Sequence, residues 1–230
     1  MITVALIGNP NVGKTAAFNQ LTGMKEHVGN WPGVTVEKKT GKCKYDGEEI
    51  ELVDLPGTYS LTARSMDELV ARNFIVEEKP DAVIDIVNNT NMERNLYLTF
   101  LLIELEAKIV LTINQWTGVG GIEIDEQKLS GILGMPVVPI VATTGEGMEE
   151  LKKVAVEVAK EKGKRANPID YGEDINALIK KVEAEIKKDT SLSSKYPTRW
   201  LAIKVLEKDE EVLKEIDESP HKGEIIDAAG

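Results

Sequence analysis

A glycine-rich run at residues 8–15, GNPNVGKT, constrains the fold of this chain more than any other stretch. It follows an apolar run and opens a helical pattern, and it fits G-x-x-x-x-G-K-[ST] in the strand–loop–helix setting that gives this motif its meaning. Glycines let successive backbone N–H groups converge on one point, and the start of the helix adds partial positive charge there. The run therefore predicts a phosphate-binding loop for a nucleoside triphosphate.

Residues in and after this loop have distinct expected roles. Lys14 supplies a point charge for the β- and γ-phosphates, and the Thr15 hydroxyl is a ligand for Mg²⁺. Asp54 ends a later apolar run and begins an Asp-x-x-Gly pattern that Gly57 completes. A carboxylate there reaches Mg²⁺, usually through water, and the glycine N–H senses a γ-phosphate. The expected nucleotide contacts of the first loop are Gly8, Asn9, Pro10, Asn11, Val12, Gly13, Lys14, Thr15 and Ala16.

Length, composition and charge limit the class of protein. With 230 residues, 42% of them hydrophobic, the chain can hold one ordinary domain and a smaller appendage. No run approaches the roughly 18 apolar residues of a membrane helix, and no signal peptide is expected. The lone Cys43 excludes an internal disulfide and favours a reducing compartment. A net charge of −11 opposes nucleic acid as the main partner.

The order of predicted elements indicates an α/β fold. Over residues 1–165, strand-like runs alternate with helical patterns, which is typical of a mostly parallel sheet with helices on both faces. An Asp46-Gly47 turn predicts an antiparallel hairpin. Such sheets bind ligands at the carboxyl ends of their strands, where the glycine-rich loop lies. The expected strands are 3–8, 35–45, 49–54, 82–88, 108–114 and 137–141, and the expected helices are 14–23, 67–78, 92–106, 125–133 and 148–162.

The pattern changes after residue 163. Residues 164–172 read as a linker, and helical periodicity without strand signals follows, with three helices expected between about 167 and 225. The tail at residues 225–230 carries no helix stop signal. We therefore predict two domains, a P-loop domain at residues 1–165 and a small helical domain at residues 166–230.

A second functional loop is expected at residues 29–37, between the two phosphate motifs. Its glycines and proline leave few packing constraints, as an order–disorder switch requires. Thr35 is the candidate hydroxyl that closes on Mg²⁺ and γ-phosphate, with Gly33 and Val34 beside it. Trp31 reads either as part of the switch or as a half-buried anchor of the loop. We expect switch segments at residues 28–37 and 54–66.

Four stretches together resemble one family: GNPNVGKT, HVGNWPGVTVE, DLPGTYSL and MERNLYL. They are similar to the N-terminal cytoplasmic GTPase domain of FeoB, the prokaryotic ferrous-iron transporter, and the second stretch is far more specific than a glycine loop. The resemblance covers residues 1 to about 165, and the helical appendage matches the family's spacer domain by position. It implies a Ras-like P-loop GTPase on the cytoplasmic side of the inner or cell membrane, followed in the polypeptide by a polytopic membrane region.

The resemblance also implies roles for residues at matching positions. Asn11 matches a position associated with potassium activation in related GTPases, together with backbone carbonyls of residues 29–31. A monovalent cation there would neutralise developing charge. Thr58 stands where Ras-like proteins carry a water-orienting glutamine, so slow GTP hydrolysis is expected. The implied catalytic residues are Lys14, Thr35, Asn11 and Gly57, and the implied Mg²⁺ ligands are Thr15, Thr35 and Asp54.

The base-recognition motif departs from the family pattern Asn-[Lys/Met]-x-Asp, because the chain has Asn114, Gln115, Trp116 and Thr117. In the family pattern, the aspartate carboxylate accepts hydrogen bonds from both N1–H and the exocyclic amine of guanine. The single hydroxyl of a threonine cannot accept both of these bonds in the same way. Losing charge-assisted bonds worth about 1.5–3 kcal/mol each predicts weak GTP binding with reduced preference over other triphosphates. The expected base contacts are Asn114, Gln115, Thr117 and the backbone clamp Val141, Ala142 and Thr143.

Three functions remain open from the sequence. The leading hypothesis is a slow regulatory GTPase of a ferrous-iron transporter, which couples switch ordering to the helical domain and the membrane pore. The second is a ribosome-associated GTPase, which the acidic composition and the 29–37 signature oppose. The third is a nucleotide-binding scaffold with negligible turnover, suggested by Thr58 and Thr117. The expected partners are GTP or GDP and the membrane region of the same polypeptide, and homo-oligomerisation is left open.

Overall fold

The computed structural model describes every residue of the chain except 63, 116–123 and 162–165. The chain divides into two units. The first comprises Met1–Ile103 and Ala107–Asn167, and the second comprises Glu104–Glu106 and Pro168–Gly230. No helix of the described part is long and apolar enough to cross a membrane.

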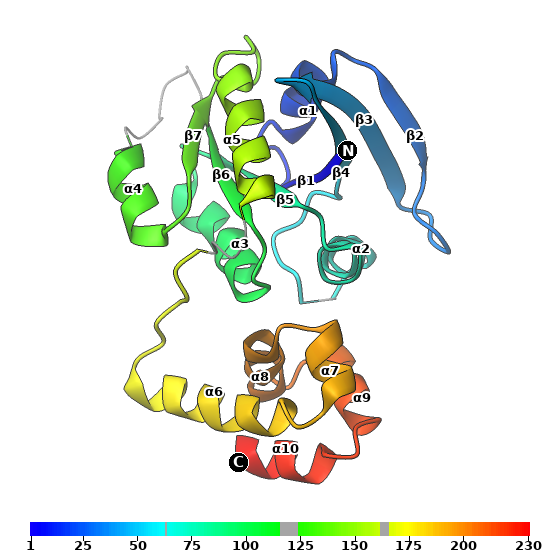
Figure 1. Cartoon of the computed structure of the whole chain (residues 1–230), viewed down its shortest axis with the longest axis vertical. Helices are drawn as coiled ribbons and strands as arrows, with labels where there is room; N and C mark the ends of the chain where they lie inside the picture. Colours follow the sequence, from blue (N-terminus) through cyan, green and yellow to red (C-terminus); the bar gives the residue numbers. More distant parts are fainter. Residues whose placement is uncertain (63, 116–123, 162–165) are drawn as a thin grey trace. The chain divides into compact units, whose positions relative to one another are not determined.

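The first unit is built on a seven-stranded sheet with the order β2-β3-β4-β1-β5-β6-β7 (Figure 1). Five strands run parallel, while β3 is antiparallel to both β2 and β4. The predicted α/β fold with a mostly parallel sheet is therefore confirmed. The strands are β1 (Ile2–Gly8), β2 (Glu26–Asn30), β3 (Glu37–Tyr45), β4 (Glu48–Asp54), β5 (Ala82–Asn88), β6 (Ile109–Asn114) and β7 (Val137–Ile140).

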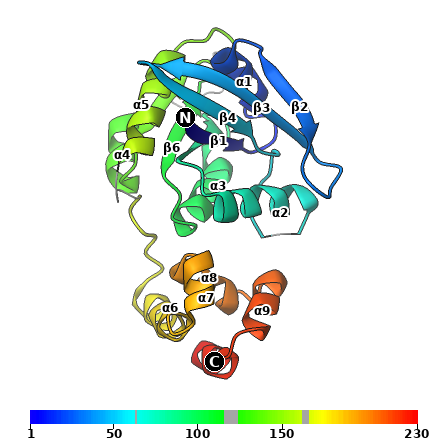
Figure 2. The same cartoon turned by 45° about the vertical axis from the view of Figure 1, so that its right-hand side comes forward.

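Helices cover both faces of this sheet. Figure 2 shows α1 and α5 together on one face and α2 and α3 on the other. Helix α2 continues directly into a π-helical segment, η1. The helices of this unit are α1 (Lys14–Thr22), α2 (Met66–Asn73), η1 (Phe74–Glu78), α3 (Met92–Glu104), α4 (Glu126–Leu133) and α5 (Met148–Lys160).

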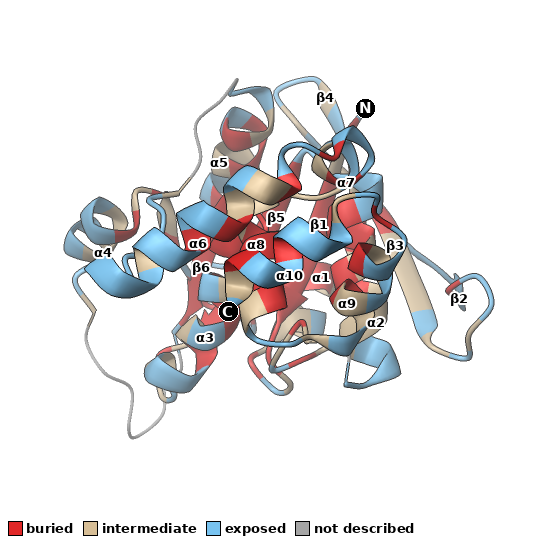
Figure 3. Cartoon of the chain, turned by 90° about the horizontal axis from the view of Figure 1, so that it is seen from below, coloured by how far each residue is buried: buried red, intermediate tan, exposed pale blue. Residues whose placement is uncertain are grey.

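The core lies where the central strands meet the two helical layers. Strands β1, β5 and β6 are buried along nearly their whole length, as their red colour in Figure 3 shows. Near-continuous apolar runs are what parallel strands need when both faces are covered. Phe18 of α1 and Leu6 of β1 are both fully buried in this core. The sheet thus gives the loop after β1 a rigid base.

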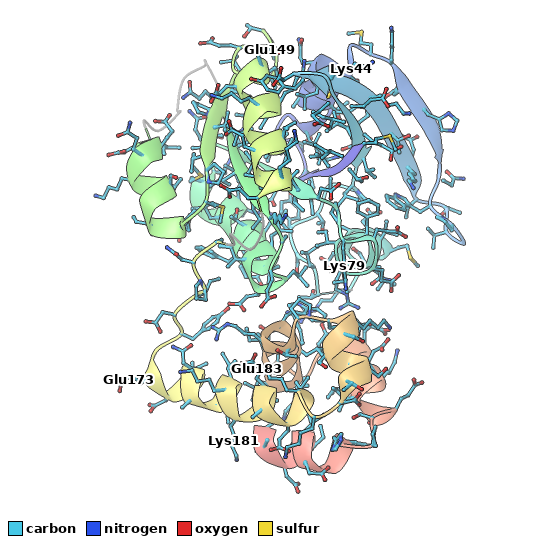
Figure 4. All side chains as sticks on the ribbon, in the orientation of Figure 1. Lys44, Lys79, Glu149, Glu173, Lys181 and Glu183 are labelled. Carbon is cyan, nitrogen blue, oxygen red and sulfur yellow. The ribbon has the colours of Figure 1, made fainter. Side chains whose placement is uncertain are left out.

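The second unit is wholly helical among the residues described. Helix α8 is its buried centre, with Trp200 1% exposed. Helix α6 packs against α8 and α10, and its buried side chains are those of Ile179, Val182 and Ile186. Figure 4 shows the charged side chains Glu173 and Lys181 of α6 extending outward. The helices are α6 (Glu173–Ile186), α7 (Thr190–Lys195), α8 (Thr198–Leu206), α9 (Glu210–Asp217) and α10 (Lys222–Ala229).

Two expectations about these elements were wrong. Residues 26–30 form the edge strand β2, although all five side chains are exposed and give no alternating apolar pattern. Antiparallel pairing with β3 creates this strand. The expected number of three helices was also too low, because α7 and α10 are further helices in this predicted helical domain. The buried side chains of Ile225 and Ala228 hold α10.

Candidate nucleotide-binding site

Two glycines shape the loop between β1 and α1. A Cβ atom at Gly8 would lie 2.5 Å from the carbonyl oxygen of Ile86, and one at Gly13 would lie 2.2 Å from Nδ2 of Asn114. Gly13 also has a φ of 93°, in the left-handed region, and caps the N-terminus of α1. The loop therefore brings the first N–H groups of α1 to the carboxyl end of β1, where an anion is stabilised.

Lys14 and Asp54 meet at this point. Lys14 is the first residue of α1, and Asp54 ends β4, which pairs with β1 so that Leu6 lies opposite Asp54. The Nζ atom of Lys14 donates to Oδ1 of Asp54, and the two side chains are only 12% and 10% exposed. Burial raises the pKa of the Asp54 carboxyl, and the charge of Lys14 offsets part of that rise. The structure thus brings together the predicted phosphate-binding lysine and the predicted magnesium-binding carboxylate.

The oxygen donors at this point fit a magnesium ion. Thr15, in the first turn of α1, is exposed and follows Lys14, and the carboxylate of Asp54 lies beside Lys14. Mg²⁺ in nucleotide sites takes one or two protein oxygens and completes its shell with phosphates and water. Thr35 is exposed and forms no hydrogen bond with another described residue.

The first predicted switch segment is partly a strand. Residues 28–30 belong to β2. The loop predicted at residues 29–37 was therefore wrong for residues 29 and 30, which lie in this strand. Trp31 is 8% exposed, more buried than a half-buried anchor. Its ring lies 5.4 Å from that of Phe74 in an edge-on arrangement, and Nζ of Lys38 lies 4.6 Å from the Trp31 ring centroid. This segment is held by an aromatic contact with η1 that the sequence did not reveal.

The second predicted switch segment begins against the glycine-rich loop. A Cβ at Gly57 would lie 3.6 Å from Cα of Pro10, and the N–H of Thr58 donates to the carbonyl oxygen of Gly8 at 3.3 Å. The Thr58 hydroxyl donates to the carbonyl oxygen of Ser60 at 2.8 Å, and Thr58 is 4% exposed. Its hydroxyl is therefore engaged in a local turn.

Asn114 ties three parts of the site together. From the end of β6, its Nδ2 donates to the carbonyl oxygen of Val12 at 2.8 Å, and its Oδ1 accepts from the N–H of Ala142 at 3.0 Å. Gln115 is held through its backbone N–H, which donates to the carbonyl oxygen of Ile140 at 2.8 Å. The sequence reasoning assigned Asn114 to the base and missed this bridging role. The sequence signal for that role is an asparagine at the end of a predicted strand, where its side chain can reach the glycine-rich loop. Positions 116 and 117, with the predicted base contact Thr117, lie outside the described residues.

The predicted base clamp lies in the loop after β7. Val141 and Ala142 are buried and Thr143 is exposed. The N–H of Val141 donates to the carbonyl oxygen of Glu146 at 3.1 Å, and the carbonyl oxygen of Val141 accepts from the N–H of Gly145 at 2.9 Å. This turn and the bond from Asn114 fix the backbone of Ala142 beside the phosphate loop.

A phosphate loop after β1, an acidic residue ending the neighbouring strand and an asparagine ending β6 together define a P-loop GTPase domain. Comparison with known proteins gives the family. Residues 2–155 match the family model of ferrous iron transport protein B, and residues 171–229 match that of the FeoB cytosolic helical domain. The chain belongs to the FeoB family, as the sequence motifs indicated.

Curated relatives carry the same description. The Fe(2+) transporter FeoB of Methanocaldococcus jannaschii is 51% identical over 216 residues, covering 92% of this chain and 32% of that protein. The Escherichia coli K12 transporter of the same name is 40% identical over 214 residues, covering 90% of this chain and 27% of that protein. The chain thus spans about a third or less of the length of these relatives.

Solved structures agree with both units. The apo cytosolic domain of the T. maritima FeoB iron transporter has a TM-score of 0.86 and 40% identity, covering 100% of this chain and 94% of that one. A GDP-bound point mutant of the S. thermophilus FeoB G-domain has a TM-score of 0.89 and 38% identity, with coverages of 100% and 88%.

Proposed function

We propose that this chain is the GTP-binding and slowly GTP-hydrolysing regulatory part of a ferrous-iron transporter, on the cytoplasmic side of its membrane. The observation that carries the proposal is the Lys14–Asp54 pair at the mouth of the glycine-rich loop. Solved FeoB cytosolic domains described as GDP and GMPPNP forms support it. The partner would be the membrane-embedded region of the same polypeptide, and the domain boundary at residues 165/166 stays part of this proposal.

The residues divide the work of phosphoryl transfer between binding and positioning. The N–H groups at the start of α1 and the ammonium of Lys14 would hold the β- and γ-phosphates. Thr15 and Asp54 would hold Mg²⁺, which supplies charge stabilisation between the phosphates when bound. Thr35, which is exposed in this conformation, would join them as a further ligand. The hydroxyl of Thr58 is engaged with Ser60, so it does not orient the attacking water, and turnover should be slow.

We propose that the part of the site that contacts the base recognises guanine only weakly. Asn114 uses one N–H and its Oδ1 for the bonds to Val12 and Ala142, which leaves the second N–H of Nδ2 for the base edge. Without a carboxylate at position 117, guanine recognition would depend on that N–H and on the backbone at residues 141–143. Reduced preference for GTP over other triphosphates follows.

Potassium activation at Asn11 would require a change of conformation. Asn11 has a φ of 66° and an exposed side chain in the loop. In this conformation Gly29 and Asn30 pair with β3, and the carbonyl oxygen of Trp31 accepts from the N–H of Val34 at 3.3 Å. Because the backbone of residues 29–31 is engaged in these bonds, we infer that this segment would rearrange to bring its carbonyl oxygens to an ion at Asn11.

Phosphate release from GTP, measured in potassium and in sodium chloride of equal ionic strength, tests the proposal. We expect slow, Mg²⁺-dependent release that is faster in potassium, and loss of the potassium effect in Asn11→Ala. Release that is equal in both salts would reject potassium at Asn11. No release above the buffer rate in either salt would favour the alternative, a nucleotide-binding scaffold without turnover.

A further inference from the structure

A polar cavity lies against the glycine-rich loop. It offers about 210 Å³ and is bounded by residues 9–12 of the loop, by Tyr59 of the second switch segment and by the start of α3. Gly13, Lys14, Thr15 and Asp54 do not line it. The cavity therefore shares residues 9–12 of the loop with the predicted nucleotide contacts, but it shares neither the phosphate-binding lysine nor the predicted magnesium ligands.

The Asn9 side chain is unpartnered in this cavity. Asn9 lines it and is 2% exposed, and neither its Oδ1 nor its Nδ2 has a hydrogen-bond partner in the described part of the chain. A buried amide without partners carries a desolvation cost of about 1–3 kcal/mol. A ligand that offers both an acceptor and a donor would relieve that cost.

Two other asparagines of the lining, Asn88 and Asn95, have their side-chain oxygens engaged by protein donors. Oδ1 of Asn88 accepts from the N–H and the hydroxyl of Thr90, both at 2.7 Å. Oδ1 of Asn95 accepts from the N–H of Asn88 at 2.8 Å, and Asn95 is 4% exposed. Because backbone N–H donors fix the identity of these oxygens, the –NH₂ groups are the ends left for a ligand. The lining is thus rich in hydrogen-bond donors.

The cavity also has a positive charge at its rim. The guanidinium of Arg94 lies 4.1 Å from the ring centroid of Tyr59, and it forms no ion pair with any described residue. No carboxylate occurs among the described lining residues. Planar guanidinium groups bind phosphate oxygens through two parallel hydrogen bonds. The charge of Arg94 and the amide donors both favour a small oxyanion.

We propose that this cavity binds inorganic phosphate, with Arg94 and the asparagine amides as donors. Hydrogen phosphate also carries an O–H that can donate to Oδ1 of Asn9, which sulfate lacks at neutral pH. The phosphate could come from the medium or from GTP hydrolysis, and only the second source rests on the proposed function. As a product site, the cavity would hold released phosphate between the glycine-rich loop and Tyr59.

The binding test uses the whole chain saturated with Mg²⁺ and a non-hydrolysable GTP analogue, which fills the γ-phosphate position. Orthophosphate is titrated at constant ionic strength while NMR follows the side-chain amide of Asn9. We expect a saturable shift, at least tenfold weaker binding in Arg94→Gln, an intermediate effect in Arg94→Lys, and a weaker response to sulfate. The matched control is Lys128→Gln, an exposed charge on α4 that should change nothing.

A missing shift, an unchanged affinity in Arg94→Gln or an equal response to sulfate would overturn the phosphate site. A second arm follows single-turnover hydrolysis with a phosphate sensor, where Arg94→Gln should release product phosphate sooner after bond cleavage. A chain that binds added phosphate but never hydrolyses GTP would contradict the proposed function and leave the phosphate site standing. If GTP cleavage and phosphate release coincide in time in both wild type and Arg94→Gln, the cavity is not a site for product phosphate.

Discussion

Lys14 and Asp54 form an ion pair across the mouth of the glycine-rich loop. Both belong to the predicted triphosphate site, one as the phosphate-binding cation and the other as the magnesium-binding carboxylate. In this conformation they neutralise each other, and we expect nucleotide and Mg²⁺ to separate them on binding. The pair thus holds a cation and an anion in place. In a magnesium–triphosphate complex, the phosphates would neutralise Lys14 and Mg²⁺ would neutralise Asp54.

Asp54→Asn should uncouple GTP affinity from magnesium. The amide cannot supply the charge that attracts Mg²⁺, while Lys14 remains to bind phosphate. GTP affinity, measured with and without Mg²⁺, should rise with the metal in wild type and change little in the variant. A full Mg²⁺ response in Asp54→Asn would show that this carboxylate has no part in metal binding.

Gly13→Ala should abolish nucleotide binding or unfold the loop. Its Cβ would lie 2.2 Å from Asn114 Nδ2, in a backbone with a φ of 93° that favours glycine. Gly131→Ala is the matched control, because nothing lies within 4 Å of a Cβ at that helical position. Thermal unfolding and nucleotide titration of both variants give the comparison. Wild-type binding in Gly13→Ala would contradict the described loop geometry.

Thr117→Asp should restore guanine preference. A carboxylate at this position would accept from two guanine N–H groups, each bond worth about 1.5–3 kcal/mol. The affinity for GTP relative to ATP should therefore rise by tens- to hundreds-fold, with little change in ATP binding. Competition titrations of wild type and Thr117→Asp measure this ratio. Strong GTP selectivity already present in wild type would refute the weak-base proposal.

Asp85→Asn should alter the pH dependence of stability. Asp85 is fully buried in β5, and the Thr99 hydroxyl donates to its Oδ2 at 2.6 Å. Burial raises its pKa to about 7, with the Thr99 bond opposing the rise. The folded protein therefore holds a proton that the unfolded chain loses near pH 4, so wild-type stability falls between about pH 4 and 7 by up to about 1.4 kcal/mol per pH unit.

Asparagine does not titrate, so the free energy of unfolding of Asp85→Asn should rise relative to that of wild type across that pH interval. Above the interval the difference between the two should stay constant. Urea unfolding at several pH values measures this difference. Asp46→Asn removes an exposed carboxyl in the β3–β4 turn and is the matched control. A pH-independent difference for Asp85→Asn would contradict a raised pKa.

The fold was predictable wherever local pattern and burial agree. Strand β5 was placed at residues 82–88, because an apolar run bounded by polar residues is what a doubly covered parallel strand requires. Strand β2 was not predictable, since its exposed residues have no strand pattern and depend on pairing with β3. Helix α10 depends on two buried residues, Ile225 and Ala228, a signal too weak to read from periodicity.

The site was predictable where function demands a fixed local motif. The glycine-rich loop, Lys14 and Asp54 follow from spacing, because phosphate geometry dictates the residues that surround it. The bridge from Asn114 to Val12 joins positions 102 residues apart, and the contact of Trp31 with Phe74 is likewise tertiary. Such contacts depend on how the sheet assembles, and no local pattern encodes them.

Calorimetric titration of Mg²⁺–GTP onto wild type and Lys14→Ala tests the central claim most directly. Lys25→Ala, an exposed lysine beyond α1, serves as the control. A charge-assisted bond to phosphate is worth about 1.5–3 kcal/mol, or roughly ten- to a hundredfold in affinity. We predict saturable binding by wild type and Lys25→Ala, and a loss of that size in Lys14→Ala. Equal binding by wild type and Lys14→Ala, or no binding by wild type, would contradict a triphosphate site built on this loop.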